Sequence, residues 1–330
     1  MTRLRDRFSK AVITMQEEIC RELESVDGGA RFREDNWDRP GGGGGRTRIL
    51  TNGDLIEQGG VNVSSVFGHL PESIRQSVGA NAGWFHASGL SIVLHPMSPM
   101  VPTMHANIRY FELYEDEGLN HPVDAWFGGG ADLTPWYLRE RDAVHFHETL
   151  RNACADLGPD CYARFKSECD RYFFNHHRGE ARGVGGIFFD HLRSGDPWPE
   201  EDLYRFTTGL GNRLMNSWVP IAERRREEPW GEEQRWWQEV RRGRYVEFNL
   251  IHDRGTLFGL RTGGRTESIL MSLPPRVRWV YNHEPVTGTP EAKLTECLRN
   301  PVDWMEIGRQ RGWIQDAKQD AKSKNSGGEE

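Results

Sequence analysis

Residues 90–114, LSIVLHPMSPMVPTMHANIRYFELY, carry two short apolar runs on either side of a proline-rich connection. The runs at 90–94 and 106–113 have the length and the branched and aromatic content of β-strands. Glycine and proline interrupt the apolar segments throughout residues 61–114, which disfavours a long helix there. This stretch therefore predicts a sheet, and the fold class depends on what surrounds it.

Helical periodicity surrounds the predicted sheet. Apolar residues recur every three or four positions in several segments, and we predict helices at residues 4–26, 143–157, 162–173 and 201–226. The chain shows no internal repeat and no domain linker, so we predict a single α+β domain over residues 1–317. Residues 318–330 contain no aromatic or branched apolar residue and are predicted to form a disordered tail.

Two further segments are rich in turn-forming residues. We predict paired strands at residues 245–250 and 256–260, joined around Asp253-Arg254-Gly255. The five glycines at 41–45 predict a flexible loop. A phosphate-binding loop would need a following Gly-Lys-Ser/Thr, which this sequence does not supply.

Composition narrows the class of protein. No apolar run approaches eighteen residues, so we expect no stable membrane insertion. Residues 1–26 mix charged and apolar side chains, which fits neither a secretory signal nor a transit peptide, and we expect a cytoplasmic location. The five cysteines form no C-x-x-C pair, which argues against a disulfide framework or a thiolate zinc site.

Charge also limits the partners. A net charge of -7 disfavours general nucleic-acid binding. Of the 42 basic residues, six are lysine and 36 are arginine. Because a guanidinium matches a carboxylate or a phosphate as a rigid fork, this excess can indicate local anion sites, but a coding bias toward arginine would explain it equally well.

Four segments combine glycine with proline, histidine, arginine and aspartate. They are residues 95–110 (HPMSPMVPTMHANIRY), 126–136 (WFGGGADLTPW), 176–190 (HHRGEARGVGGIFFD) and 244–273 (RYVEFNLIHDRGTLFGLRTGGRTESILMSL). Glycine allows a ligand to approach the backbone closely, and charged groups at loop or strand ends can then contact that ligand. A structured turn is the alternative for any one such segment, whereas four together indicate a binding site.

Individual residues in these segments suggest acid–base and anion chemistry. Asp132 follows three glycines and could accept or relay a proton, although a turn cap is the alternative. Six arginines could bind a polycarboxylate: Arg109, Arg178, Arg182, Arg254, Arg261 and Arg265. Four histidines raise the possibility of a metal site, but their spacing lacks a compact ligand pattern: His95, His105, His147 and His177. The chain has no dinucleotide or Walker motif, so a bound nucleotide is not supported.

Three of these segments carry strings that resemble the oxygen-dependent coproporphyrinogen III oxidases of haem biosynthesis. The strings are WFGGGADLTP, RGVGGIFFD, and GRYVEFNL with DRGTLFGL and TGGRTESILMS, and the resemblance extends over residues 11–313. It implies a large antiparallel sheet flanked by helices on both faces, in a homodimer. It also implies a small-molecule substrate, coproporphyrinogen III, two of whose propionates are oxidatively decarboxylated to vinyls to give protoporphyrinogen IX.

The resemblance further implies cofactors and site residues. Molecular oxygen would be the co-substrate, with no flavin, haem or nucleotide. The resemblance to bacterial members implies a divalent metal at His95, His105, His147 and His177, whereas the resemblance to other members implies none. His105 resembles the family's proton donor, Arg182 one of its functional arginines, and Asp132 is our candidate partner for the pyrrole N–H. The expected substrate-binding residues are Ser91, Asn107, Ile108, Arg109, Arg178, Asp253, Arg254, Gly263, Gly264 and Arg265.

Two other functions fit parts of the same pattern. A metal-dependent hydrolase would use the histidines to activate water. A non-catalytic tetrapyrrole carrier would need the arginines but not Asp132. Consumption of coproporphyrinogen with oxygen uptake by metal-free protein would distinguish the oxidase from both.

Overall fold

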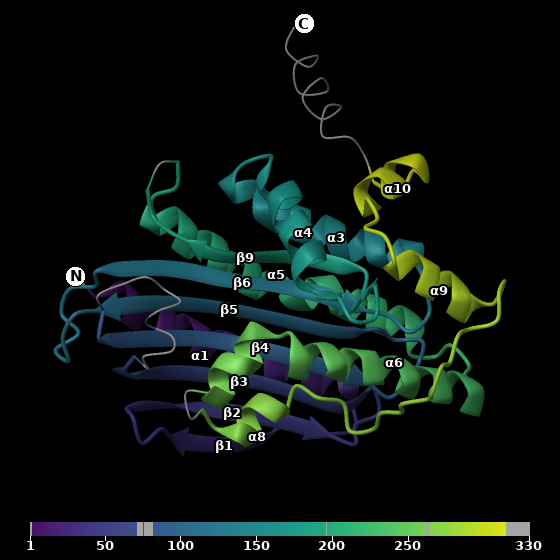
Figure 1. The fold of residues 1–330 in the computed structure, drawn as a ribbon, viewed down its shortest axis with the longest axis horizontal. Helices are drawn as coiled ribbons and strands as arrows, with labels where there is room; N and C mark the ends of the chain where they lie inside the picture. The colour runs from purple at the N-terminus through teal and green to yellow at the C-terminus, as the bar shows by residue number, and fades with distance from the viewer. Residues whose placement is uncertain (1, 71–74, 76–81, 196, 262–263, 315–330) are drawn as a thin grey trace, which may run out of the picture.

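The computed structural model describes residues 2–70, 75, 82–195, 197–261 and 264–314. Its centre is a seven-stranded antiparallel sheet in the order β1-β2-β3-β4-β5-β6-β9 (Figure 1). The strands are β1 (Arg33–Asp38), β2 (Gly43–Thr51), β3 (Ile56–His69), β4 (Trp84–Pro96), β5 (Thr103–Tyr114), β6 (Asp124–Thr134) and β9 (Gly185–Leu192). A separate two-stranded ribbon pairs β7 (Phe174–Asn175) with β8 (Glu180–Ala181).

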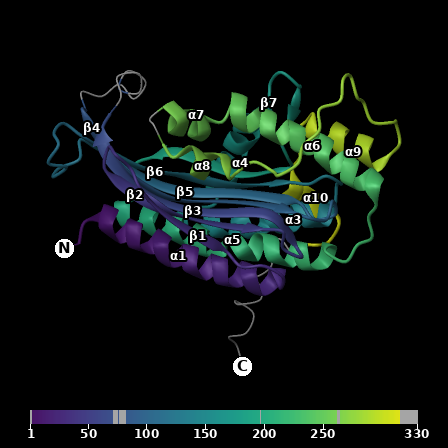
Figure 2. The same cartoon turned by 90° about the horizontal axis from the view of Figure 1, so that it is seen from below.

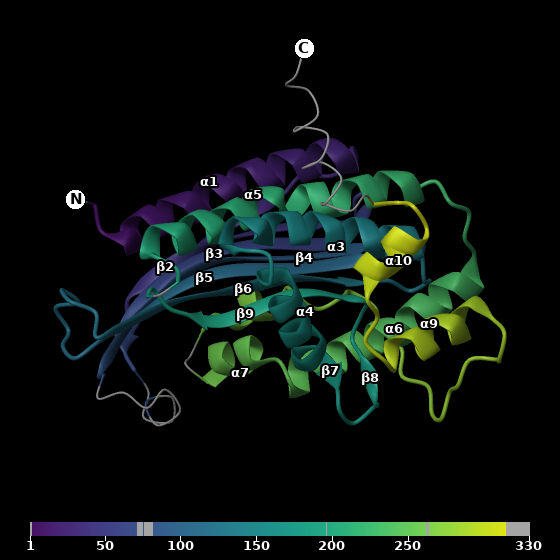
Figure 3. The ribbon, with the colours of Figure 1, turned by 90° about the horizontal axis from the view of Figure 1, so that it is seen from above.

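Helices cover both faces of the large sheet. Figures 2 and 3 show α1, α3 and α5 on one face, and α6, α7 and α8 on the other. The first group is α1 (Leu4–Asp27), α3 (Glu140–Cys154) and α5 (Glu200–Arg225), and the second is α6 (Glu232–Ile251), α7 (Arg254–Arg261) and α8 (Thr266–Leu270). The other helices in the described residues are α4 (Cys161–Tyr172), which packs against β9, the 3-10 turn η1 (Ala155–Leu157), α9 (Pro290–Leu298) and α10 (Trp304–Gln310). The α+β class with an antiparallel sheet is confirmed.

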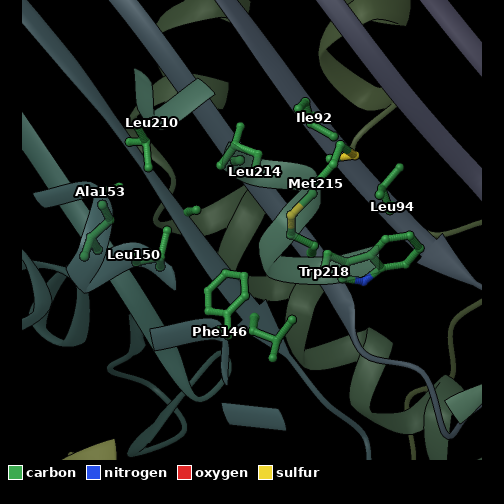
Figure 4. Close-up of a cluster of buried hydrophobic side chains, with 14 of the residues drawn as sticks. Ile92, Leu94, Phe146, Leu150, Ala153, Leu210, Leu214, Met215 and Trp218 are labelled. Atoms are coloured by element: carbon green, nitrogen blue, oxygen red, sulfur yellow. The ribbon is translucent and has the colours of Figure 1, made fainter. Parts of the chain in front are cut away.

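The main hydrophobic core lies between the sheet and the first helix group. Figure 4 shows Ile92 and Leu94 of β4 beside Phe146 of α3 and Leu214 and Trp218 of α5. All five side chains are almost fully buried. A strand alternates its side chains between the two faces. This core therefore receives alternate residues of the two strands, Leu90, Ile92 and Leu94 of β4 and Met104, Ala106 and Ile108 of β5, and the positions between them face α6. The predicted site residues of these strands lie on the second face, except Ile108.

Several predicted elements are confirmed, and one is wrong. The helices predicted at 4–26, 143–157, 162–173 and 201–226 correspond to α1, α3 with η1, α4 and α5. The predicted hairpin of 245–250 and 256–260 is instead the end of α6 followed by α7. The buried residues Trp237, Val240, Tyr245 and Phe248 recur at helical spacing along α6, and this longer period outweighs the local β-propensity.

The glycine run also differs from its prediction. Residues 43–45 begin β2 and pair with β3, and Gly44 and Gly45 also pair with β1, which differs from the predicted flexible loop. A Cβ atom on Gly45 would collide with the indole ring of Trp37, so glycine is what lets that ring lie across the strand. The predicted disordered tail, 318–330, lies outside the described residues. None of the helices in the described part of the chain is long and apolar enough to span a membrane.

Candidate active site

His105 and Asp132 form the centre of the candidate site. They are direct partners in the register of β5 and β6, so their side chains leave the same face of the sheet. The Nδ1 atom of His105 lies 2.8 Å from Oδ1 of Asp132. The imidazole is 15% exposed, whereas the carboxylate is only 1% exposed. The histidine is therefore the member of the pair that a ligand can reach.

Arg182 lies beside this pair and is itself buried. Its Nη2 atom donates to both oxygens of Asp132, at 2.7 and 2.9 Å, and Nη1 donates to Oδ1 of Asn249 at 2.5 Å. Three aromatic rings surround the guanidinium, with Phe173, Tyr245 and Phe248 at 4.3, 4.5 and 4.8 Å from its central carbon. These ring faces stabilise a cation that has lost its contact with water.

The charges of the cluster follow from these contacts. Burial alone would raise the pKa of Asp132, but the positive charge of Arg182 and the hydrogen bond from His105 outweigh it and lower that pKa. Burial likewise opposes the charge of Arg182, yet the neighbouring Asp132 raises its pKa. Because an ionised carboxylate only accepts hydrogen bonds, Nδ1–H of His105 donates to Asp132 and a neutral ring keeps Nε2 as its acceptor. The arrangement can therefore transfer a proton at Nε2.

Small and polar residues on three neighbouring strands lie next to His105 and Asp132. Ser91, Asn107 and Gly130 are aligned across β4, β5 and β6, and Arg109 is aligned with Gly128 in the next row on the same face. A Cβ atom on Gly128 would lie 2.6 Å from Nε of Arg109, so the arginine lies flat over the glycine. The glycines thus leave room for a broad ligand above the sheet.

Arg109 is fixed by two further polar groups. Its Nη1 atom donates to Oδ1 of Asn107 at 3.2 Å, and Nη2 lies 3.0 Å from Oδ1 of Asp190. The side chain is about one-third exposed. Ile108, predicted to contact substrate, points instead into the opposite core and is fully buried. Successive side chains of β5 point to opposite faces of the sheet, which explains this orientation. A ligand on the other face can therefore contact only the backbone of Ile108.

Three of the other predicted arginines pair with carboxylates of the chain, whereas Arg261 is an exposed residue at the end of α7. Arg178 donates to both oxygens of Glu247 at 2.8 and 2.6 Å, Arg254 lies 3.7 Å from Asp190, and Arg265 lies 2.5 Å from Asp35 on β1. β1 lies four strands from β5, so Asp35 and Arg109 are separated by roughly 19 Å. A ligand that contacts both Arg109 and Arg265 must therefore extend across several strands.

The remaining predicted binding residues have local structural roles. Asp253 accepts from the Tyr172 hydroxyl at 2.9 Å and from the backbone N–H of Thr256 at 2.7 Å at the start of α7. The backbone N–H of Gly264 donates to the carbonyl of Gly259 at 2.8 Å. Gly263 lies outside the described residues. Asp253 and Gly264 thus shape the segment that leads from α7 to α8.

The four histidines proposed as metal ligands are not brought together. His95 contacts Thr103 and the carbonyl of Ser272, and His147, on the opposite side of the sheet, contacts Tyr162 and the carbonyl of Val184. In both rings, each nitrogen is already in contact with a protein group. Among the residues that the structure describes, no group of three or more ligating side chains could hold a metal ion. The residues present therefore do not fit the predicted four-histidine metal site.

His177 is placed apart from His105 as well. Its Nδ1 atom lies 2.9 Å from Nε2 of His252, and its Nε2 atom lies 2.9 Å from Glu247. It belongs to the polar group that holds Arg178, at the surface of α6. The structure therefore places His177 and His105 in separate polar groups, and the metal assignment stays a prediction.

Sequence reasoning missed three residues of the site. Tyr245 and Asn249, both next to Arg182, are four positions apart on α6 and therefore share one helical face. The segment was interpreted as a strand, which hid this relationship. The third residue is Asp190, which ends the RGVGGIFFD string but was not assigned a role.

Comparison with known families gives a match that spans the site. The family model of coproporphyrinogen III oxidase matches residues 7–304 of the 330. The matched range contains His105, Asp132, Arg182 and Asn249, and also the row of Ser91, Asn107 and Gly130. The chain therefore belongs to the coproporphyrinogen III oxidase family, whose enzymes oxidatively decarboxylate coproporphyrinogen in haem biosynthesis.

Proposed function

We propose that the chain is the oxygen-dependent enzyme, which converts two propionates of coproporphyrinogen III to vinyls and yields protoporphyrinogen IX. In each conversion a propionate loses CO₂ from its terminal carbon and a hydrogen from the carbon next to the ring. The two electrons pass to O₂, which takes up two protons and leaves as H₂O₂. The main support is the hydrogen bond between the ionised, buried Asp132 and the partly exposed His105. Next to this pair, Gly128 and Gly130 leave space above the sheet, and Arg109 lies beside that space.

The protein's contribution is orientation and proton handling. Asp132 fixes His105 through Nδ1, so Nε2 can hold or release a proton at the substrate. Arg182 keeps Asp132 ionised, and Arg109 offers two N–H groups to a propionate. Asp132 is buried, so we place its action on the pyrrole N–H through His105 and not through direct contact.

Oxygen is proposed as the only oxidant, without flavin, haem or nucleotide. An electron-rich pyrrole can react with O₂ once its N–H is deprotonated, and the site then has to orient the ring and shield the reactive intermediate. We also propose a homodimer acting in the cytoplasm. The homodimer follows from the family resemblance of the sequence, and the location is the expectation drawn from its composition.

The test is turnover of coproporphyrinogen III with an oxygen electrode, in chelator-treated protein. We expect one O₂ consumed for each vinyl formed, and no product under strict anaerobiosis. Product formed anaerobically with another electron acceptor would exclude oxygen dependence. Turnover that returns only after a divalent cation is added would show that a metal is required.

A further inference from the structure

Asp190 contacts one arginine on the sheet and a second arginine on α7. It lies near the end of β9 and faces the same side of the sheet as Asp132. Its Oδ1 atom is 3.0 Å from Nη2 of Arg109 on β5, and its Oδ2 atom is 3.7 Å from Nη2 of Arg254 on α7. The carboxylate is 19% exposed, so a ligand at the two arginines would lie next to it.

Each of the two arginines also has a contact besides Asp190 that holds its position. Arg109 lies over Gly128 and donates to Asn107. Arg254 lies over the ring of Tyr172, with 4.8 Å between the guanidinium carbon and the ring centroid. What Asp190 adds is charge, because one carboxylate beside two guanidiniums leaves a single net positive charge for a ligand.

The carboxylate is held in its ionised form. Burial alone would raise the pKa of Asp190, but the charge and hydrogen bond of Arg109 lower it. Its Oδ1 atom also accepts from the backbone N–H of His191 at 2.9 Å, where the chain turns with a positive φ of 51°. Asp190 is therefore a fixed negative charge at the edge of the Arg109–Arg254 pair.

We propose that Asp190 determines specificity, because it limits the Arg109–Arg254 pair to one substrate carboxylate per pyrrole. The inference rests on the proposed function. Coproporphyrinogen carries one carboxylate on each pyrrole, which the remaining net positive charge can balance. A tetrapyrrole with two carboxylates on each pyrrole would bring a second negative charge against Asp190 and be disfavoured.

The test compares Asp190→Asn with Asp124→Asn. The amide at position 190 keeps an oxygen for the His191 N–H and Arg109, removes the negative charge, and replaces the oxygen that faces Arg254 with an NH2 group. Asp124 is the matched control, since it also lies on this part of the sheet and pairs with another arginine, Arg193, at 2.9 and 2.8 Å. The probes are coproporphyrin III, with four carboxylates, and uroporphyrin III, with eight, titrated by fluorescence, together with kcat/KM for coproporphyrinogen III.

We expect Asp190→Asn to shift the affinity ratio toward uroporphyrin by about tenfold, as removal of one charge at this distance implies. Asp124→Asn should shift it by less than about twofold. Equal shifts in both variants would show a general effect of net charge and overturn the inference. Weaker binding of both porphyrins to Asp190→Asn would show that Asp190 positions Arg109, which would also overturn it.

A second variant and the activity of the wild type separate failure of the specificity inference from misfolding and from failure of the proposed function. Asp190→Ser, whose hydroxyl can accept the same His191 N–H, replaces the amide variant if the latter does not fold, and is judged by the same ratio. If the wild type turns over coproporphyrinogen while the ratio does not move, the specificity inference alone is wrong. If the wild type neither binds coproporphyrin nor consumes coproporphyrinogen, the proposed function is wrong as well.

Discussion

Arg182 donates to both carboxylate oxygens of Asp132, at 2.7 and 2.9 Å, although the two side chains are only 2% and 1% exposed. Removing both charges from water is unfavourable, and the close contact between them offsets this loss only while both partners are present. The pair therefore ties the stability of the fold to the ionised state of the site.

The first prediction concerns this buried pair. Arg182→Met should lower the free energy of unfolding by about 3–5 kcal/mol, because it leaves Asp132 buried without a counter-charge. Urea denaturation followed by circular dichroism measures the change. The control is Arg193→Met, whose pair with Asp124 is 45% and 30% exposed and should contribute less than about 1 kcal/mol. Equal losses in the two variants would contradict the assigned role of burial.

The second prediction concerns proton transfer. Asp132→Asn should lower kcat by about 10²–10⁴-fold, since an amide neither orients His105 as an ionised carboxylate does nor stabilises its charged form. Binding of coproporphyrin III should change little, because Arg109 is held by other groups. Steady-state kinetics and a fluorescence titration separate the two effects. Wild-type turnover in this variant would leave Asp132 with a structural role only.

The third prediction concerns the histidines. His105→Ala should impair turnover, whereas His147→Ala should lower stability by about 1–3 kcal/mol with kcat largely retained, because Tyr162 and the carbonyl of Val184 lose their buried partner. His95→Ala and His177→Ala should resemble His147→Ala. Activity assays and elemental analysis of all four variants provide the measurement. Bound metal in the wild type that disappears together with activity in every variant would show a shared ion.

The fourth prediction concerns acid stability. Burial would raise the pKa of Glu247, but hydrogen bonds from Arg178 and His177 and the charge of Arg244 lower it from 4.5 to about 2. A lowered pKa means that its stabilising effect is complete above pH 4.5 and is lost as the pH falls toward 2. Glu247→Gln should remove this loss, which is roughly 3 kcal/mol over the full range. Unfolding free energies at pH 5 and pH 3 for both proteins check it, and parallel pH dependences would refute it.

Much of the secondary structure could be predicted because its signals are local. The helical stripe at 4–26 predicts α1, and the apolar runs at 90–94 and 106–113 are the centres of β4 and β5. The helix α6 was missed at its second half, where Tyr245-Val246 and Phe248 resemble a strand in isolation. Only packing of Trp237, Val240, Tyr245 and Phe248 along one face reveals the helical period.

The site could be predicted in part. The sequence predicts Asp132, Arg182 and His105 as site residues from residue type, local glycine context and family resemblance. None of these signals says which side chains contact one another. The register of β5 and β6 places His105 opposite Asp132, and the turn before β9 brings Arg182 to the same carboxylate. Asn249 joins them from α6, 67 residues further along the chain than Arg182.

The amino-acid sequence alone determined the elements with strong periodicity, the class of the fold and, through its motifs, the family. These properties depend on residues close together in the chain or on strings that can be recognised without coordinates. Tertiary structure decided that the four proposed histidine ligands are separated, that Ile108 faces the opposite core, and that Asp190 lies between two arginines. Distances between remote side chains depend on strand register and helix packing, which no local pattern encodes.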